Sequence, residues 1–101
     1  MSKNLKALIE YPKAGILSKE VFKNEMFDCT LFSMAKGTEI STHTSSKHGL
    51  IYVIEGKGIF DLAGKKIIME PGVFFYMEKN AAHSLKVEMN TAFLLILIMV
   101  N

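Results

Sequence analysis

The sequence predicts an all-β domain, a sandwich or barrel of short strands. Turn-forming residues recur along the chain, and the intervals between them are mostly too short for a helix of three turns. The intervals are rich in β-branched and aromatic residues, which favour strands. Strand-sized segments at a spacing of roughly 8–12 residues are typical of sandwiches and barrels. The breaks fall at Pro12, Gly15, Gly37, 42–47, Gly56, Gly58, Gly64, Pro71-Gly72 and Lys79-Asn80.

The first ten residues leave their structure open. Leu5, Leu8 and Ile9 form an apolar group that suits a short helix, an arm strand or a segment exchanged with a second subunit. The first strand pattern is at 29–34, where positions 29, 31 and 33 would share one face and the intervening residues the other.

The later strands are predicted from apolar runs. The last run has helix-forming Leu and Met residues, so a helix is an alternative there. Because its neighbours are strands and it has no polar stripe, we expect a strand that is covered on both faces. The predicted segments are 50–54, 59–60, 67–69, 73–77 and 92–100.

Length and composition exclude several classes of protein. The 101 residues, 50% of them hydrophobic, have room for one domain with a single core. A net charge of +2, spread along the chain, argues against a nucleic-acid surface. The single cysteine, Cys29, excludes an internal disulfide. The N-terminus lacks a signal-peptide pattern, and no apolar run approaches the roughly 20 residues of a membrane helix. We therefore expect a soluble cytoplasmic protein without a membrane or nucleic-acid partner.

Three histidines are the main candidates for chemistry: His43, His48 and His83, all in polar regions between predicted strands. Histidine is the commonest metal ligand and titrates near neutral pH. Taken singly, each has a plainer explanation. A histidine in or beside the polar turn at 42–47 is often solvated, and His83 would suit a half-buried strand position with its ring bonded to the backbone.

The spacing of these residues resembles the two motifs of cupins. The slots of the first motif read Gly, His, His, Glu, Gly, and those of the second read Gly, Pro, Gly, His, Asn. The resemblance runs from about Gly15 to the C-terminus. The residues of this chain in those slots are Gly37, His43, Ser45, Gly49 and Gly56, then Gly72, Glu78, Asn80, His83 and Val87.

The resemblance implies a cupin double-stranded β-helix, or jelly-roll barrel, over residues 15–101. Residues 1–14 would form an N-terminal arm that can take part in a dimer interface, because similar cupins pair as homodimers. In metal-binding cupins, the ligands are the two histidines and the glutamate of the first motif and the histidine of the second. Here Ser45 and Gly49 replace two of the four ligands, while His43 and His83 remain.

Two interpretations of the site follow. In the first, His43, His48 and His83 form a three-histidine site for a divalent transition metal, and this donor set suits Zn, Ni, Fe or Cu. His48 lies one residue before the glutamate slot, so it reaches the interior only if the strand is irregular there. In the second, the site is eroded, and His43 and His83 bind an organic ligand or stabilise the core.

The function predicted first is therefore binding of a small-molecule ligand in the barrel. An apolar lining would support it, and its expected members are Phe32, Phe60, Phe74, Phe75 and Phe93. The alternative is a metal-dependent enzyme of the isomerase, lyase or dioxygenase type that acts on a small polar substrate. A structural or partner-binding module is a third alternative, because so many apolar residues exceed the needs of one core.

Overall fold

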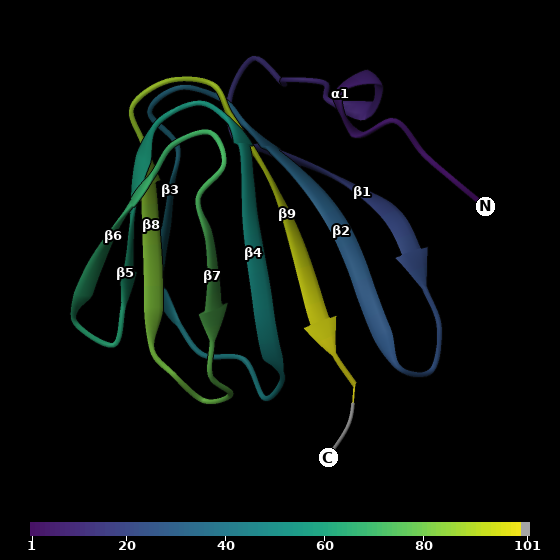
Figure 1. The fold of residues 1–101 in the computed structure, drawn as a ribbon. Coiled ribbons are helices and arrows are strands. Elements are labelled where there is room, and N and C mark those ends of the chain that lie inside the picture. The colour runs from purple at the N-terminus through teal and green to yellow at the C-terminus, as the bar shows by residue number, and fades with distance from the viewer. Residues whose placement is uncertain (100–101) are drawn as a thin grey trace.

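The computed structural model describes residues 1–99. Two antiparallel sheets face each other as in a jelly roll, with a short helix beside one of them (Figure 1). The elements are α1 (Leu5–Leu8), β1 (Ile16–Lys23), β2 (Phe27–Met34), β3 (Glu39–His43), β4 (His48–Glu55), β5 (Gly58–Leu62), β6 (Lys65–Met69), β7 (Phe74–Met77), β8 (His83–Val87) and β9 (Thr91–Ile98).

The predicted all-β class and jelly-roll architecture are confirmed. One sheet has five strands in the order β1-β2-β9-β4-β7, and the other has four in the order β3-β8-β5-β6. The apolar run near the C-terminus is the strand β9, which pairs with β2 on one side and β4 on the other. Val100, the last residue of that predicted run, and Asn101 lie outside the described residues.

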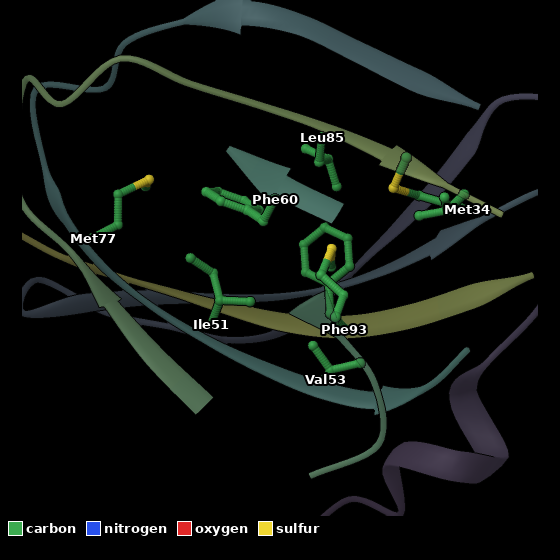
Figure 2. Close-up of a cluster of buried hydrophobic side chains, with 9 residues drawn as sticks. Met34, Ile51, Val53, Phe60, Met77, Leu85 and Phe93 are labelled. Atoms are coloured by element: carbon green, nitrogen blue, oxygen red, sulfur yellow. The ribbon is translucent and has the colours of Figure 1, made fainter. Parts of the chain in front are cut away.

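The space between the two sheets is filled by one apolar cluster (Figure 2). Alternation along β4 sends Ile51 and Val53 inward, where they are 1% and 0% exposed, while Tyr52 between them is 40% exposed. Close packing of such a core leaves its side chains little freedom to move. The buried members are Met34, Ile51, Val53, Phe60, Met69, Met77, Leu85, Val87 and Phe93.

The N-terminal residues form the short helix, one of the three alternatives for this segment. The Asn4 side chain caps α1 by accepting a hydrogen bond of 3.2 Å from the backbone N–H of Ala7. Leu5, Leu8 and Ile9 then pack against a second apolar cluster, whose buried members are Val21, Cys29 and Leu31. Burial in this cluster raises the pKa of the Cys29 thiol, and the nearby Asp28 carboxylate acts in the same direction.

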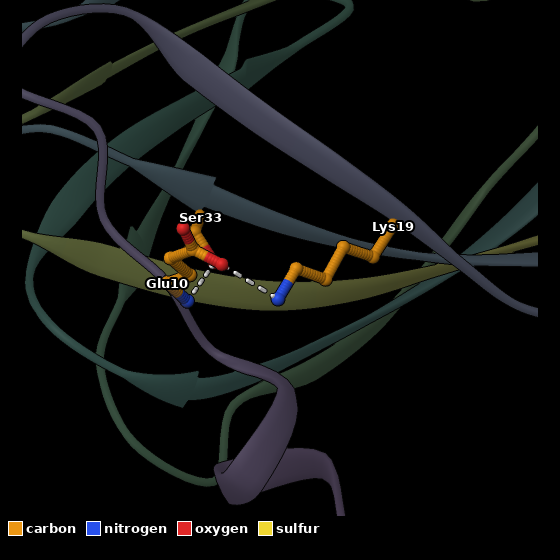
Figure 3. A network of polar contacts seen from close by, with 3 residues as sticks. All are labelled: Glu10, Lys19 and Ser33. Atoms are coloured by element: carbon orange, nitrogen blue, oxygen red, sulfur yellow. Dashed lines mark hydrogen bonds and ion pairs between the residues drawn. The ribbon is translucent and has the colours of Figure 1, made fainter.

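Hydrogen bonds and an ion pair connect the segment after α1 to the five-stranded sheet. The backbone N–H of Glu10 donates to Ser33 Oγ at 3.3 Å, and the Glu10 carboxylate pairs with Lys19 Nζ at 3.0 Å (Figure 3). Tyr11 Oη donates to Glu55 Oε2 at 2.7 Å. Among residues 1–99, no helix is long and apolar enough to cross a membrane.

Two glycines and an asparagine adopt the left-handed backbone that their turns require. The φ angles are +105° at Gly56, +91° at Gly72 and +66° at Asn80. Asparagine tolerates this region better than most residues that carry a side chain, which explains why it can stand in a glycine slot.

Candidate functional site

His83 begins β8 and points to the inside of the barrel. It lies on the same face of the strand as Leu85 and Val87, and it is only 6% exposed. Its ring is nearly parallel to that of Phe60, with an interplanar angle of 7° and centroids 5.7 Å apart. One side of the imidazole therefore contacts the apolar core.

A β-bulge brings His43 to His83. In the pairing of β3 with β8, Ile40 lies opposite Leu85 and His43 opposite His83, so β3 has two residues between these pairs where β8 has one. Regular alternation from the inward Ile40 would have turned His43 away from the core. The extra residue reverses that orientation, and bulges often re-aim a side chain in this way. The two imidazole centroids are 4.1 Å apart.

Both rings are held in the same manner by the backbone. Nδ1 of His43 lies 2.9 Å from the carbonyl oxygen of Ser41, and Nδ1 of His83 lies 2.9 Å from that of Ala81. A carbonyl oxygen can only accept, so Nδ1 is the donor in both contacts, and in a neutral ring the lone pair is then on Nε2. This arrangement is typical of histidines that bind a metal or a hydrogen-bond donor through Nε2.

His43 is exposed and His83 is buried, so the pair lies where the barrel interior meets solvent. The His43 side of the pair is therefore in contact with solvent. The sequence alone gave no sign of the bulge on which this placement depends.

His48 does not join the pair. It is the first residue of β4, and the inward positions of this strand are Gly49, Ile51 and Val53. The irregularity that an inward His48 would require is absent, because His48 is already in register with Ile98 of β9. The His48 ring instead stacks on Tyr76, and its Nδ1 lies 2.5 Å from the Tyr76 hydroxyl. Of the three predicted ligands, the structure therefore brings only His43 and His83 together.

Gly49 occupies the glutamate slot of the first cupin motif, and apolar atoms fill the space beside it. A Cβ atom built at this position would lie 3.0 Å from Met77 Cε and 3.5 Å and 3.6 Å from methyl carbons of Leu95 and Leu97. Where cupins that bind metal have a carboxylate, this chain has a hydrocarbon surface.

The donor set therefore fits a metal only in part. In residues 1–99, no group of three or more His, Cys, Asp and Glu side chains could hold a metal ion. The pair could supply at most two ligands, whereas open catalytic sites usually have three protein ligands. The pair is accordingly suited to an organic ligand or to an ion whose other ligands come from outside the chain.

The expected aromatic lining is partly corrected. Phe60 and Phe93 are buried in the core, and Phe32 and Phe75 pack against it. Phe74, however, is 59% exposed, because alternation along β7 turns it to the outer surface of the sheet. Tyr52 and Tyr76 are on the same outer surface, which separates both hydroxyls from the barrel interior.

An open groove of about 850 Å³ lies elsewhere, along β3, β5, β6 and β8. Two ion pairs cross it, Lys86 to Glu39 at 3.3 Å and Lys66 to Asp61 at 3.7 Å. The lining includes neither histidine of the pair. Its charged groups largely neutralise each other on a solvated surface.

Comparison with solved structures places the fold among cupins. A conserved protein of unknown function from Streptococcus pyogenes aligns over 100% of this chain and 89% of its own, with 19% identity and a TM-score of 0.88. A cupin 2 conserved barrel domain protein from Leptotrichia buccalis aligns over 95% of this chain and 47% of its own, with 29% identity and a TM-score of 0.87. Salicylate 1,2-dioxygenase from Pseudoaminobacter salicylatoxidans aligns over 83% of this chain and 25% of its own, with 19% identity and a TM-score of 0.78.

Among curated protein sequences, none is similar enough to this chain to count as a match. The sequence profile of the cupin domain matches residues 30–99, which include both motifs. With the two-sheet barrel and the inward histidine pair, this match shows that the chain belongs to the cupin family.

Proposed function

We propose that this cupin binds a small molecule at the barrel mouth, with the Nε2 atoms of His43 and His83 as its polar contacts. The observation that carries the proposal is the shared tautomer of the two rings. Each has its Nδ1 against a backbone carbonyl, and the two rings lie with their centroids 4.1 Å apart at the edge of an apolar interior. Binding sites in proteins commonly combine a mostly apolar wall with a few placed polar groups.

A purely structural role for the pair accounts less well for the exposure of His43 than ligand binding does. A core-stabilising histidine is usually buried with both ring nitrogens bonded, yet His43 is exposed at the end of an edge strand. A bulge in β3 is needed to turn it inward. Bulges are over-represented at sheet edges, at barrel rims and next to active sites, where they re-aim a side chain.

The test is a thermal-shift screen of small carboxylates, phenols and sugars, followed by calorimetry on the compounds that stabilise the protein. Stabilisation should be lost in His43→Ala and in His83→Asn, a variant that retains a polar side chain at the buried position. It should be retained in His48→Ala, because His48 is on the outer surface. Equal stabilisation of all three variants, or none across the panel with natively folded protein, would contradict the proposal.

The alternative function is a metal-dependent enzyme that acts on a small polar substrate. The same geometry favours it, since Nε2 of a histidine whose Nδ1–H is bonded is a good metal ligand. The salicylate 1,2-dioxygenase from Pseudoaminobacter salicylatoxidans has the same fold. Elemental analysis of untagged protein distinguishes the two. One tightly held equivalent of Zn, Ni, Fe or Cu that disappears in His43→Ala would favour the enzyme.

A further inference from the structure

Two connections between strands lie at the same end of the barrel as the histidine pair, and they are hydrogen-bonded to each other (Figure 1). Residues 44–47 join β3 to β4, and residues 78–82 join β7 to β8. We infer that His48 is a pH switch for the 78–82 connection. Its neutral ring holds the start of this connection, and protonation of the ring releases it. The inference concerns the chain alone and needs no ligand.

The contacts of His48 show which ring nitrogen is free of a proton. The backbone N–H of Lys79 lies 3.4 Å from His48 Nδ1, and a backbone N–H can only donate. Nδ1 is therefore the acceptor. The Tyr76 hydroxyl, 2.5 Å from the same atom, must then donate to it as well. Both contacts as they stand require a neutral ring with its proton on Nε2.

Protonation of the ring turns Nδ1 from an acceptor into a donor. The Tyr76 hydroxyl can rotate and accept from the new N–H, so this contact can survive in the opposite direction. The Lys79 N–H has no such choice, because it would face another N–H. Histidine is the side chain that ordinarily changes charge between about pH 5 and pH 8. The bond between Lys79 and His48 is therefore the one that is lost on acidification.

No opposite charge holds the ring in one protonation state. Tyr76 of β7 stacks on the ring, and Ile98 lies opposite His48 in the neighbouring strand β9. The ion pairs within residues 1–99 do not include His48 or any charged residue of the two connections. Those charged residues are Lys47, Glu78 and Lys79.

Two backbone hydrogen bonds hold the same connection without the ring. The N–H of Asn80 donates to the Ser45 carbonyl at 2.7 Å, and the N–H of Ala63 donates to the Ala82 carbonyl at 2.8 Å. Neither bond involves a titratable group, and His83 keeps its pairing with β5. Release in acid is therefore confined to the start of the connection. Ligand affinity at the histidine pair should accordingly not depend on His48.

The experiment is amide hydrogen exchange of the full chain, followed by NMR at about pH 7.5 and about pH 5.5, on either side of the usual histidine titration. Rates are corrected for the intrinsic effect of pH on exchange. The matched variant is His48→Asn, whose side-chain oxygen can accept near the position of Nδ1 and does not titrate. His43 and His83 are present in both proteins, so their own titration cancels in the comparison.

We expect the protection of the Lys79 amide in wild type to fall by about fivefold at the lower pH, which corresponds to about 1 kcal/mol, the usual net value of one hydrogen bond. In His48→Asn it should stay constant. The Ala63 amide should keep its protection in both proteins, because its bond to Ala82 does not involve the ring. In wild type, the midpoint of the change at Lys79 should coincide with the midpoint of His48 protonation in the imidazole ¹⁵N spectrum.

The ¹⁵N comparison needs wild type only, so it tests the inference even where His48→Asn does not fold. Constant protection of Lys79 in wild type would overturn the inference, as would an equal fall in both proteins or a midpoint that follows His43 or His83 instead. A parallel fall at Ala63 would show general loosening and would overturn it too. Since no ligand is used, these outcomes leave the proposed function untouched, and failure of the ligand screen leaves the switch untouched.

Discussion

Gly49 and Met77 lie opposite each other in the β4–β7 pair, and the Met77 methyl group fills the space where a side chain at position 49 would begin. In cupins that bind metal, a glutamate stands in the slot of Gly49. In this chain the missing carboxylate ligand and the apolar surface beside position 49 therefore go together. Substituting both residues should therefore restore a carboxylate ligand at position 49.

Gly49→Glu combined with Met77→Ala should create a three-ligand metal site. The smaller residue at 77 removes the contact at 3.0 Å, and the new carboxylate adds a charged ligand to the histidine pair. We expect Ni²⁺ affinity to rise by at least about tenfold over wild type, which corresponds to about 1.4 kcal/mol. Calorimetry measures this directly.

Met77→Ala alone is the control for that double variant. It enlarges the space beside Gly49 without adding a ligand, so Ni²⁺ affinity should stay at the wild-type value. If the double variant binds Ni²⁺ no better than this control, position 49 does not point toward the histidine pair.

Gly56→Ala should destabilise the protein severely. A Cβ atom at Gly56 would lie 2.4 Å from Thr91 Cα and 2.6 Å from the Asn90 carbonyl oxygen, in a backbone with φ of +105°. Neither backbone contact can move without shifting the start of β9. We expect a loss of about 3 kcal/mol or more in the free energy of unfolding.

Gly64→Ala separates the two causes of that loss. Gly64 has a φ of +86°, but a Cβ atom there meets nothing within 4 Å. Its variant should lose only about 1–2 kcal/mol, the cost of the left-handed backbone. Urea denaturation of both variants tests the comparison, and equal losses would contradict it.

The Tyr11–Glu55 hydrogen bond should make stability depend on pH in the alkaline range. Burial of the Tyr11 hydroxyl, followed by the hydrogen bond to Glu55 and the charge of that residue, raises the Tyr11 pKa well above its ordinary value. The unfolded chain loses this proton near pH 10, whereas the folded protein retains it. The stabilisation is thus complete below about pH 10 and declines as the pH rises further.

Tyr11→Phe should therefore cost about 1 kcal/mol at neutral pH, the usual net value of a hydrogen bond. The difference from wild type should shrink above about pH 10, because wild type alone loses this stabilisation. Urea denaturation at the two pH values measures it, with Tyr52→Phe as an exposed control. A difference that stays constant or grows with pH would show that the Tyr11 proton is not held in the folded state.

An exposed aromatic group on β4 and β7 should be part of a homodimer contact. Tyr52 is 40% exposed, Phe74 59% and Tyr76 52%, and all three lie on the outer surface of the five-stranded sheet. Exposed aromatic residues grouped in this way are typical of interfaces. We expect light scattering to give about twice the 11.3 kDa chain mass. Phe74→Lys should reduce it, whereas Ile68→Lys, on the other sheet, should not.

Much of the barrel could be predicted from the sequence because turns and β-rich segments are local features. The slots at Gly56, Gly72 and Asn80 were found from spacing, and all three adopt the positive φ that such slots require. His43 and His83 could be paired only through the resemblance to cupins. Nothing local indicates the bulge that turns His43 inward.

The placements of Phe74 and His48 differ from the predictions because composition alone does not show which face of a strand a residue occupies. The run Phe74-Phe75-Tyr76-Met77 is apolar on both faces, so its composition could not show that Phe75 and Met77 face inward. For His48, a shift of one residue decides between core and surface, and the regular start of β4 puts it outside. The bond between Tyr11 and Glu55 joins residues 44 positions apart, a distance over which composition carries no signal.

The contacts of α1 bear on where this protein can be shortened. The cupin profile begins at residue 30, within β2, and thus leaves out α1 and β1. Cutting the chain there would remove Cys29 with the start of β2, uncover Leu31 and leave the shortened β2 with an open edge ready to pair with other molecules. The smallest piece that stays in solution as a monodisperse species therefore extends beyond the family profile, and fragments meant for crystallisation or isotope labelling should retain residues 1–29.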